Sequence, residues 1–265
     1  MLKIPILTYH DILAPDSVEE IKSPLLKPYT LPAEIFERHL TLVRSEDYTV
    51  ISIEDLLVKH LKKEGSSAKL AVITFDDGLL GNYLVAYPLL KKAGCTATFF
   101  VIAGKIGEDN MMSWGHLQEL VRNGMTVGSH TLTHRYPSEL NEEEIRYELI
   151  ESKKLLEDRL RIGIDFLSVP TGFHNKKMLE IAEEAGYKAV CSGIEGAVRP
   201  DSDLYSLPSF CIRNGIKEEE FIKILHCDNS MISKRRLRQA TYKAAKKVLG
   251  VKGYEMLKLA LQAGR

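Results

Sequence analysis

Short apolar runs alternate with amphipathic stretches along most of this chain. The apolar runs predict β-strands, which we expect at residues 4–10, 48–51, 70–75, 96–102, 126–129, 166–169 and 189–191. Between them, apolar residues recur at helical spacing and predict helices around Phe36, Leu40 and Val43, up to Gly94, and at residues 53–61, 114–123, 142–161 and 176–185. Such alternation of strand and helix predicts parallel strands joined by crossover helices.

Polar residues follow several of these strands, and all of them lie at carboxyl-terminal strand ends. They are His10, Asp76, Asp77 and His130, with Pro170 in the corresponding place after a later strand. Active sites of α/β barrels form at that end, and the length of 265 residues suits one such barrel. We therefore expect an α/β fold with a (β/α) barrel over residues 1–230 and a helical extension packed on it over residues 231–265.

The composition is that of a globular protein, but its charge is unevenly distributed. Hydrophobic residues make up 45% and charged residues 27%, which excludes disordered, collagen-like and disulfide-rich classes. The formal net charge is zero. From residue 231 onward, however, Glu255 is the single acidic residue beside the basic Lys234, Arg235, Arg236, Arg238, Lys243, Lys246, Lys247, Lys252, Lys258 and Arg265.

This basic tail has two interpretations. An apolar stripe at helical spacing, formed by Leu237, Ala240, Ala244 and Val248, fits a solvated helix packed on the acidic barrel. It also fits docking to an anionic membrane or a lipid-linked glycan, through Lys234, Arg235, Arg236 and Arg238. Interleaved aromatic residues are sparse, so we expect no nucleic-acid partner.

The cysteines and the amino terminus bear on location. Cys95, Cys191, Cys211 and Cys227 lack metal-site or CxxC spacing, so we expect free thiols. The first residues lead directly into a strand-like run without a signal-peptide pattern, and no apolar run reaches the roughly 18 residues of a membrane span. We expect a cytoplasmic protein, with the membrane contact of the tail as the peripheral alternative.

Two motifs carry the chemistry. Asp76 and Asp77 end a buried strand and precede Gly78, while His130 and His134 stand four residues apart after a later strand. One carboxylate and two imidazoles can hold a divalent ion with positions open for water, and the second carboxylate is then free to act as a base. Each motif alone also fits a turn, a helix cap or a surface pair, but their joint occurrence at strand ends favours a site.

The spaced combination of the two motifs resembles the polysaccharide deacetylase family, also known as the NodB homology or carbohydrate esterase family 4 group. The similarity extends to the stretches at residues 6–10, 87–101 and 114–130. The resemblance implies a distorted (β/α) barrel that removes acetyl groups from N-acetylhexosamines with a divalent metal, usually zinc. It implies that Asp77, His130 and His134 are the metal ligands and that Asp76 is the catalytic base.

The chain departs from the family in its later motifs. The third motif retains Pro170 and Gly172 but lacks the expected arginine, for which Arg199 and Arg213 are candidates, each of which also fits a surface residue. Backbone N–H groups around Thr171 to Phe173 are candidates to bind the substrate oxyanion, in a substrate site that also includes Pro170 and Gly172. The last motif is expected to supply a histidine as general acid, and the candidates are His226, which also fits a plain helix residue, and His10.

These residues suit amide hydrolysis, which needs an activated nucleophile, charge stabilisation at the carbonyl oxygen and a proton for the leaving amine. We therefore expect a metal-dependent hydrolase that deacetylates an N-acetylated amino sugar in a glycan or glycan precursor. The alternatives are hydrolysis of a non-sugar C–N bond by the same site and a non-catalytic barrel that binds glycan.

Overall fold

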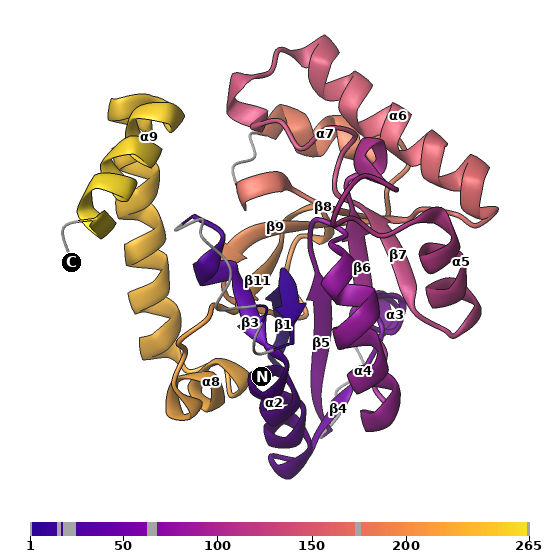
Figure 1. Cartoon of the computed structure of the whole chain (residues 1–265), viewed down its shortest axis with the longest axis vertical. Coiled ribbons are helices and arrows are strands. Elements are labelled where there is room, and N and C mark those ends of the chain that lie inside the picture. Colours follow the sequence, from indigo (N-terminus) through magenta and orange to yellow (C-terminus); the bar gives the residue numbers. More distant parts are fainter. Residues whose placement is uncertain (1, 15–16, 18–24, 63–67, 173–175, 264–265) are drawn as a thin grey trace.

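A closed barrel of parallel strands forms the body of the protein in the computed structural model, which describes residues 2–14, 17, 25–62, 68–172 and 176–263 (Figure 1). Strand β1 pairs with β5 on one side and with β11 on the other, so the sheet closes on itself. The seven barrel strands among the described residues are β1 (Ile4–Tyr9), β5 (Lys69–Phe75), β6 (Thr98–Val101), β7 (Thr126–Ser129), β8 (Phe166–Ser168), β9 (Ala189–Glu195) and β11 (Leu207–Cys211). The predicted (β/α) barrel is thus confirmed.

The barrel is distorted where its pairing is weakest. Strands β7 and β8 share the single register pair Ser129 and Leu167, and the register shifts between β9 and β11. Strand β11 was not predicted from the sequence, because Pro208 and Ser209 interrupt its apolar pattern. In the described part of the chain, four short strands flank the barrel: β2 (Asp11–Leu13), β3 (Thr30–Pro32), β4 (Tyr48–Val50) and β10 (Ala197–Val198).

Helices surround the barrel on its outside (Figure 1). Helix α4 follows a π-helical segment, η2 (Asn82–Ala86), and ends at Gly94, whose φ of 65° suits glycine. The helices are α2 (Ala33–Ser45), α3 (Ile53–Lys62), α4 (Tyr87–Ala93), α5 (Trp114–Arg122), α6 (Glu142–Leu160), α7 (Lys176–Glu184), α8 (Glu218–Leu225) and α9 (Asn229–Ala263). The short 3-10 turns are η1 (Lys27–Tyr29), η3 (Ala103–Lys105), η4 (Pro137–Glu139), η5 (Pro170–Gly172) and η6 (Leu204–Ser206).

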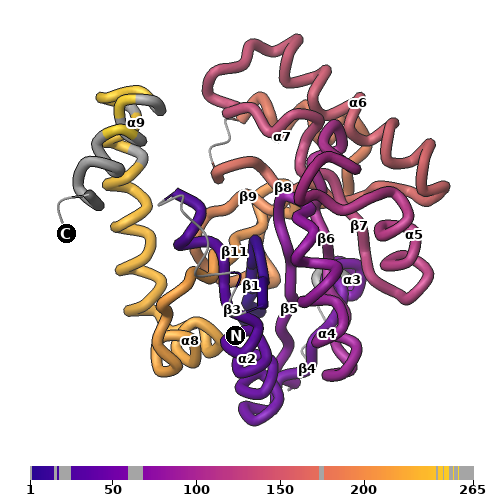
Figure 2. The backbone as a smooth tube through the Cα atoms, in the orientation of Figure 1, coloured from indigo at the N-terminus to yellow at the C-terminus, as the bar shows by residue number. Residues whose placement is uncertain are grey.

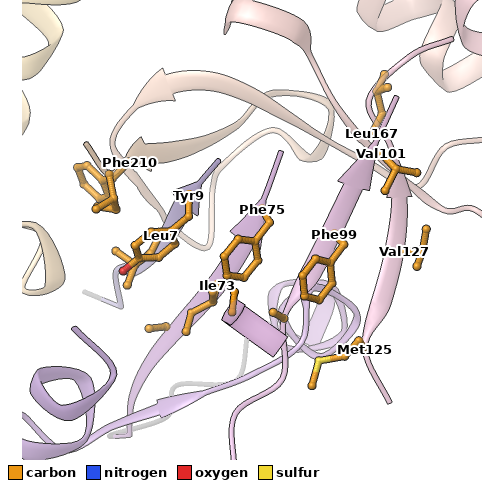
Figure 3. Packing of buried hydrophobic residues seen from close by; sticks show 14 of the residues in the cluster. Leu7, Tyr9, Ile73, Phe75, Phe99, Val101, Met125, Val127, Leu167 and Phe210 are labelled. Atoms are coloured by element: carbon orange, nitrogen blue, oxygen red, sulfur yellow. The ribbon is translucent and has the colours of Figure 1, made fainter. Parts of the chain in front are cut away.

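The main core lies between the barrel strands and the helices. Phe75 of β5 stacks on Phe99 of β6 with ring centroids 5.0 Å apart, and on Tyr9 of β1 at 5.7 Å (Figure 3). Phe36 of α2 meets both Tyr9 and Phe75 edge-on and is fully buried. Burying such rings contributes about 2 to 3 kcal/mol each, so this cluster stabilises β1, β5 and β6, the first two of which lead into His10 and the aspartate pair.

Alternation along the strands sends the other set of side chains into the barrel. The hydroxyl of Thr74 donates to that of Thr8 at 2.9 Å inside the barrel. Because side chains two residues apart share a face, His10 and Asp76 stand one layer above this pair, toward the carboxyl ends of their strands. The alternation of side chains along each strand thus places polar residues at the carboxyl rim, which consists of the residues that follow the carboxyl ends of the barrel strands.

The long helix α9 stands beside the barrel (Figures 1 and 2). Its first turns pack through the buried Met231 and Ile232. The stripe predicted to pack on the barrel faces solvent instead, since Leu237 is 68% and Val248 83% exposed. Among the described residues, none of the helices combines the length and apolar character needed to cross a membrane.

Candidate active site

Asp77, His130 and His134 meet at the carboxyl rim. Asp77 follows β5, and His130 and His134 lie on the loop after β7. The Asp77 Oδ1 atom lies 3.5 Å from His130 Nε2 and 3.3 Å from His134 Nε2, and one potential ligand atom of each residue lies within 4.8 Å of the others. The structure therefore brings together the three residues that the sequence assigned to a metal.

The donor atoms fit a zinc ion. Two ligands about 2.1 Å from one zinc ion at a tetrahedral angle lie about 3.4 Å apart, close to the 3.5 and 3.3 Å separations from the Asp77 oxygen. His130 donates its Nδ1 hydrogen to the carbonyl of Ser168 at 2.8 Å, which leaves the Nε2 lone pair directed at the cluster. Such a bond fixes both the tautomer and the orientation of the ring.

The protonation states of these three residues also favour a metal site. Burial lowers the pKa of His130, and burial together with the neighbouring His130 lowers the pKa of His134 to about 4. Burial acts to raise the pKa of Asp77, but the attraction of His10, His130 and His134 outweighs it and the pKa is lowered. At neutral pH the cluster therefore consists of two neutral imidazoles and one carboxylate, the ionisation state that binds a divalent metal.

Glu148 holds the loop between the two histidines. Its buried carboxylate, on α6, accepts hydrogen bonds from the backbone N–H groups of Leu132 at 2.9 Å and Thr133 at 2.8 Å, and from the Thr133 hydroxyl. His134 has a φ of 63°, in the left-handed region, so the loop needs such support. The sequence analysis missed this residue, although an acidic residue three positions after Ile145, on the buried side of a helix, was a usable signal.

Asp76 is buried beside the metal cluster. Its Oδ2 accepts a hydrogen bond from the Ser168 hydroxyl at 3.2 Å, and its Oδ1 is buried without a hydrogen-bond partner among the described residues. Burial raises the pKa of Asp76 to about 7, against an opposing attraction by His10. A carboxylate whose pKa lies near the working pH is suited to general-base catalysis.

Comparison with known proteins agrees with this geometry. The family model described as polysaccharide deacetylase matches residues 63–190. A poly-β-1,6-N-acetyl-D-glucosamine N-deacetylase of Staphylococcus aureus (strain MRSA252) is 31% identical over 202 residues, which cover 71% of this chain and 69% of that protein. The chain belongs to the polysaccharide deacetylase family.

Solved structures support the assignment. The Streptococcus pyogenes deacetylase PplD, solved in complex with acetate, is 27% identical, with a TM-score of 0.75 over 84% of this chain and 98% of that one. IcaB from Ammonifex degensii, at 23% identity, shares the fold with a TM-score of 0.72 over 84% of this chain and 96% of its own. This chain is accordingly a hydrolase of the polysaccharide deacetylase family.

Ser168 is the residue that contacts Asp76 in this deacetylase-family site, where the family's third-motif arginine is absent. It lies in the same stretch, at the end of β8, and bonds both Asp76 and, through its carbonyl, His130. Arg199 is placed elsewhere, because the residue before it pairs with Ile4 at the amino end of β1. Sequence reasoning did not single out Ser168, since a lone serine in a strand carries no distinctive pattern.

His10 lies at the site, at the top of β1. Its charge lowers the pKa of both Asp76 and Asp77, and its Nδ1 is buried without a hydrogen-bond partner among the described residues. The His10 ring packs on the Tyr29 ring with centroids 4.9 Å apart, and the guanidinium of Arg213 lies 5.1 Å from the centroid of the same Tyr29 ring. The structure therefore places Arg213, but not Arg199, at the carboxyl rim.

His226, one of the two candidates for the general acid, lies away from the metal cluster. His226 caps the end of α8, pairs with Glu46 at 2.9 Å and stacks on Tyr48 at 6.1 Å. Tyr48 pairs with Lys69, the first residue of β5, whereas Asp76 follows its last. At about 3.3 Å per residue, roughly 20 Å of barrel separates the two ends, so His226 cannot reach the metal cluster.

The turn at Pro170, Thr171 and Gly172 lies at the carboxyl end of β8, two residues beyond Ser168. Thr171 has a φ of 61°, and Gly172 packs so closely on Gly193 of β9 that a Cβ at Gly193 would lie 2.7 Å from the Gly172 Cα. Glycine is thus required at 193 by space as well as by its own φ of 66°. Phe173, which the sequence analysis grouped with this turn, lies outside the described residues.

Proposed function

We propose that this protein removes acetyl groups from N-acetylhexosamine residues of a glycan, with a divalent ion, zinc by its donor set, held by Asp77, His130 and His134. The observation that carries the proposal is the buried carboxylate of Asp76 beside a cluster whose donor spacing suits zinc. The similarity to an N-deacetylase of poly-β-1,6-N-acetyl-D-glucosamine supports a polymer of N-acetylglucosamine as substrate.

Different residues of this chain act in different steps of the hydrolysis. An ion at this site would acidify a water molecule and polarise the acetamide carbonyl. Asp76 accepts the proton of the attacking water, and the Ser168 hydroxyl holds the carboxylate in place. His10, whose Nδ1 is free of protein partners among the described residues, donates a proton to the leaving amine. The Thr171 backbone N–H is the donor that this turn offers to the oxyanion, because Pro170 has no N–H and Gly172 donates its own to the Val169 carbonyl at 3.3 Å.

The first experiment measures acetate released from β-1,6- and β-1,4-linked oligomers of N-acetylglucosamine by zinc-loaded and chelated protein. We expect acetate from the zinc-loaded protein alone. Asp76→Asn should bind zinc but lose at least about a hundredfold in kcat, the scale of general-base catalysis, whereas His134→Ala should lose both zinc and turnover. His226→Ala, at the opposite end of the barrel, is the matched histidine control and should turn over normally.

The outcomes separate the alternatives. Stoichiometric zinc without acetate from any sugar, but with hydrolysis of a simple N-acetyl amide, would favour the non-sugar amidase. Zinc and glycan binding without hydrolysis would favour the non-catalytic barrel. Retained turnover in Asp76→Asn would show that another group is the base.

The exposed side of α9 is the candidate surface for contact with a membrane. Arg235 does not contribute to such a surface, because its guanidinium pairs with the Glu195 carboxylate of the barrel, whereas Arg236 is exposed and donates to the Glu195 backbone carbonyl. Lys234 and Arg238 remain exposed beside Leu237, which suits peripheral contact with anionic lipid. Co-sedimentation with vesicles containing phosphatidylserine tests this, since Lys234→Gln with Arg238→Gln should weaken binding at low salt; unchanged binding would remove the proposal.

A further inference from the structure

His10 occupies a bend in the chain, between the last residue of β1 and the first residue of β2. In the described part of the chain, the pairing of β1 with β5 ends at Tyr9, and the pairing of β2 with β3 begins at Asp11. The two strand ladders therefore do not include His10 itself. Because its imidazole is the proposed proton donor, the contacts that fix this bend bear directly on catalysis.

The segment that follows β5 holds the chain at this bend. The backbone N–H of Asp76 donates to the Tyr9 carbonyl at 2.9 Å. Six residues further along the segment, the side-chain amide of Asn82 donates to the His10 carbonyl. One short segment thus carries the proposed base and the adjacent metal ligand, Asp77, and also holds the backbone of the proposed acid.

Gly81 brings this segment into direct contact with the bend. A Cβ at Gly81 would lie 2.3 Å from the Asp11 Oδ1 atom and 2.5 Å from the Ile12 carbonyl oxygen, so the approach requires glycine. The close approach allows the short side chain of the next residue, Asn82, to reach the carbonyl of His10.

Asn82 is an unusual residue for its surroundings. It is fully buried, begins the π-helical segment η2, and its Oδ1 has no hydrogen-bond partner among the described residues. Burying an amide with one half unpaired costs stability, and an apolar side chain of similar size would avoid that cost. π-Helical turns are rare and are frequent at functional sites. The bond to the His10 carbonyl explains why an amide stands at this position.

We propose that Asn82 is a positioning residue for the general acid, and that its amide holds the His10 backbone so that the imidazole faces the departing amine of the substrate. This inference rests on the proposed deacetylase function. Proton transfer needs heavy atoms about 2.6 to 3.2 Å apart, and a misplacement of about 1 Å can cost a hundredfold in rate. Because Asn82 is fully buried, it acts through His10 and not on the substrate.

The test replaces Asn82 and compares an amide with an activated ester. Asn82→Leu removes the donor but keeps a side chain of similar size. In zinc-loaded protein it should lower kcat on a β-1,6-linked pentamer of N-acetylglucosamine about ten- to a hundredfold, with KM and zinc affinity unchanged. Hydrolysis of 4-nitrophenyl acetate should stay nearly unchanged, because 4-nitrophenolate departs without a proton. Asn82→Ala, which adds no volume, gives the same comparison if the leucine variant does not fold.

A double-mutant cycle separates positioning from a merely structural role. His10→Ala alone should lower kcat on the pentamer at least about a hundredfold, and the addition of Asn82→Leu should cost nothing more. Leu90→Ala is the control for general destabilisation, because Leu90 is a fully buried residue of the adjoining helix α4. It should lower the melting temperature without changing the ratio of pentamer turnover to ester turnover.

Four results would overturn the inference. They are an equal loss on both substrates in Asn82→Leu, a loss that adds in full to that of His10→Ala, a changed substrate ratio in Leu90→Ala, and wild-type turnover of the pentamer in the Asn82 variants. Acetate release from the pentamer by wild type supports the proposed function whatever Asn82 does. If zinc-loaded wild type releases no acetate from it, the proposed function fails and this inference with it.

Discussion

Removing the Glu148 carboxylate should loosen the histidine loop and weaken metal binding. In Glu148→Ala, the N–H groups of Leu132 and Thr133 lose their acceptor in a largely buried place. A buried donor left without a partner costs about 1 to 3 kcal/mol, so the two together should lower the free energy of unfolding by about 2 to 6 kcal/mol. Glu148→Gln keeps an acceptor but loses the charge, and should cost about 2 kcal/mol.

The effect on the metal follows from the position of the loop. Residues that orient a metal ligand typically change metal affinity 10- to 100-fold when mutated. His134 directly follows Thr133, which Glu148 holds, and its own backbone N–H donates to the Thr131 hydroxyl in the same loop. Urea unfolding of the metal-free protein and zinc titration against a chromophoric chelator measure the two effects separately. Glu151→Gln, on the same helix and half-buried, is the control.

Two results would refute this reasoning. Wild-type zinc affinity in Glu148→Ala would show that the loop keeps its conformation without the carboxylate. Equal losses of stability in Glu148→Gln and Glu151→Gln would show that the three hydrogen bonds to Glu148 contribute nothing specific.

Three further predictions concern stability. Burial lowers the pKa of His39 to about 4, so as pH falls the unfolded chain binds this proton before the folded protein does. Between pH 7 and pH 4 the free energy of unfolding of wild type should therefore fall by about 3 kcal/mol more than that of His39→Asn. A difference between the two proteins that does not change with pH in urea unfolding would contradict this. Arg235→Met leaves the Glu195 carboxylate without its charge partner and should lower the free energy of unfolding by about 3 kcal/mol, with partial recovery in the double variant with Glu195→Gln. Gly193→Ala places a Cβ 2.7 Å from the Gly172 Cα and should lower the melting temperature by several degrees, whereas an unchanged melting curve would show that the turn can move aside.

The metal cluster was predictable because its signal is local. Asp76 and Asp77 are adjacent, and His130 and His134 lie within one short loop, so strand ends at one rim suffice to bring them together. Glu148 and Ser168 escaped prediction for the opposite reason. Ser168 bonds Asp76, 92 residues away, and Glu148 bonds a loop 15 residues away across the end of β7, and nothing adjacent to either residue marks the contact.

The assignment of His226 failed for a related reason. A leucine and histidine at the end of a helix match a short motif, but the motif does not say at which end of the barrel the helix stops. The partners Glu46 and Tyr48 at the amino end of the barrel decide that, and Glu46 lies 180 residues away in sequence.

By itself, the sequence determined the alternation of strand and helix, the residues of the metal cluster and the barrel that they imply, because periodicity and adjacent motifs are properties of local chain geometry. Only the tertiary structure decided how β11 closes the barrel against β1, and which face of α9 turns inward. The apolar stripe of α9 suggested one face, but the ion pair of Arg235 with Glu195 selects the other. Contacts of this kind depend on where distant segments meet, which local pattern does not encode.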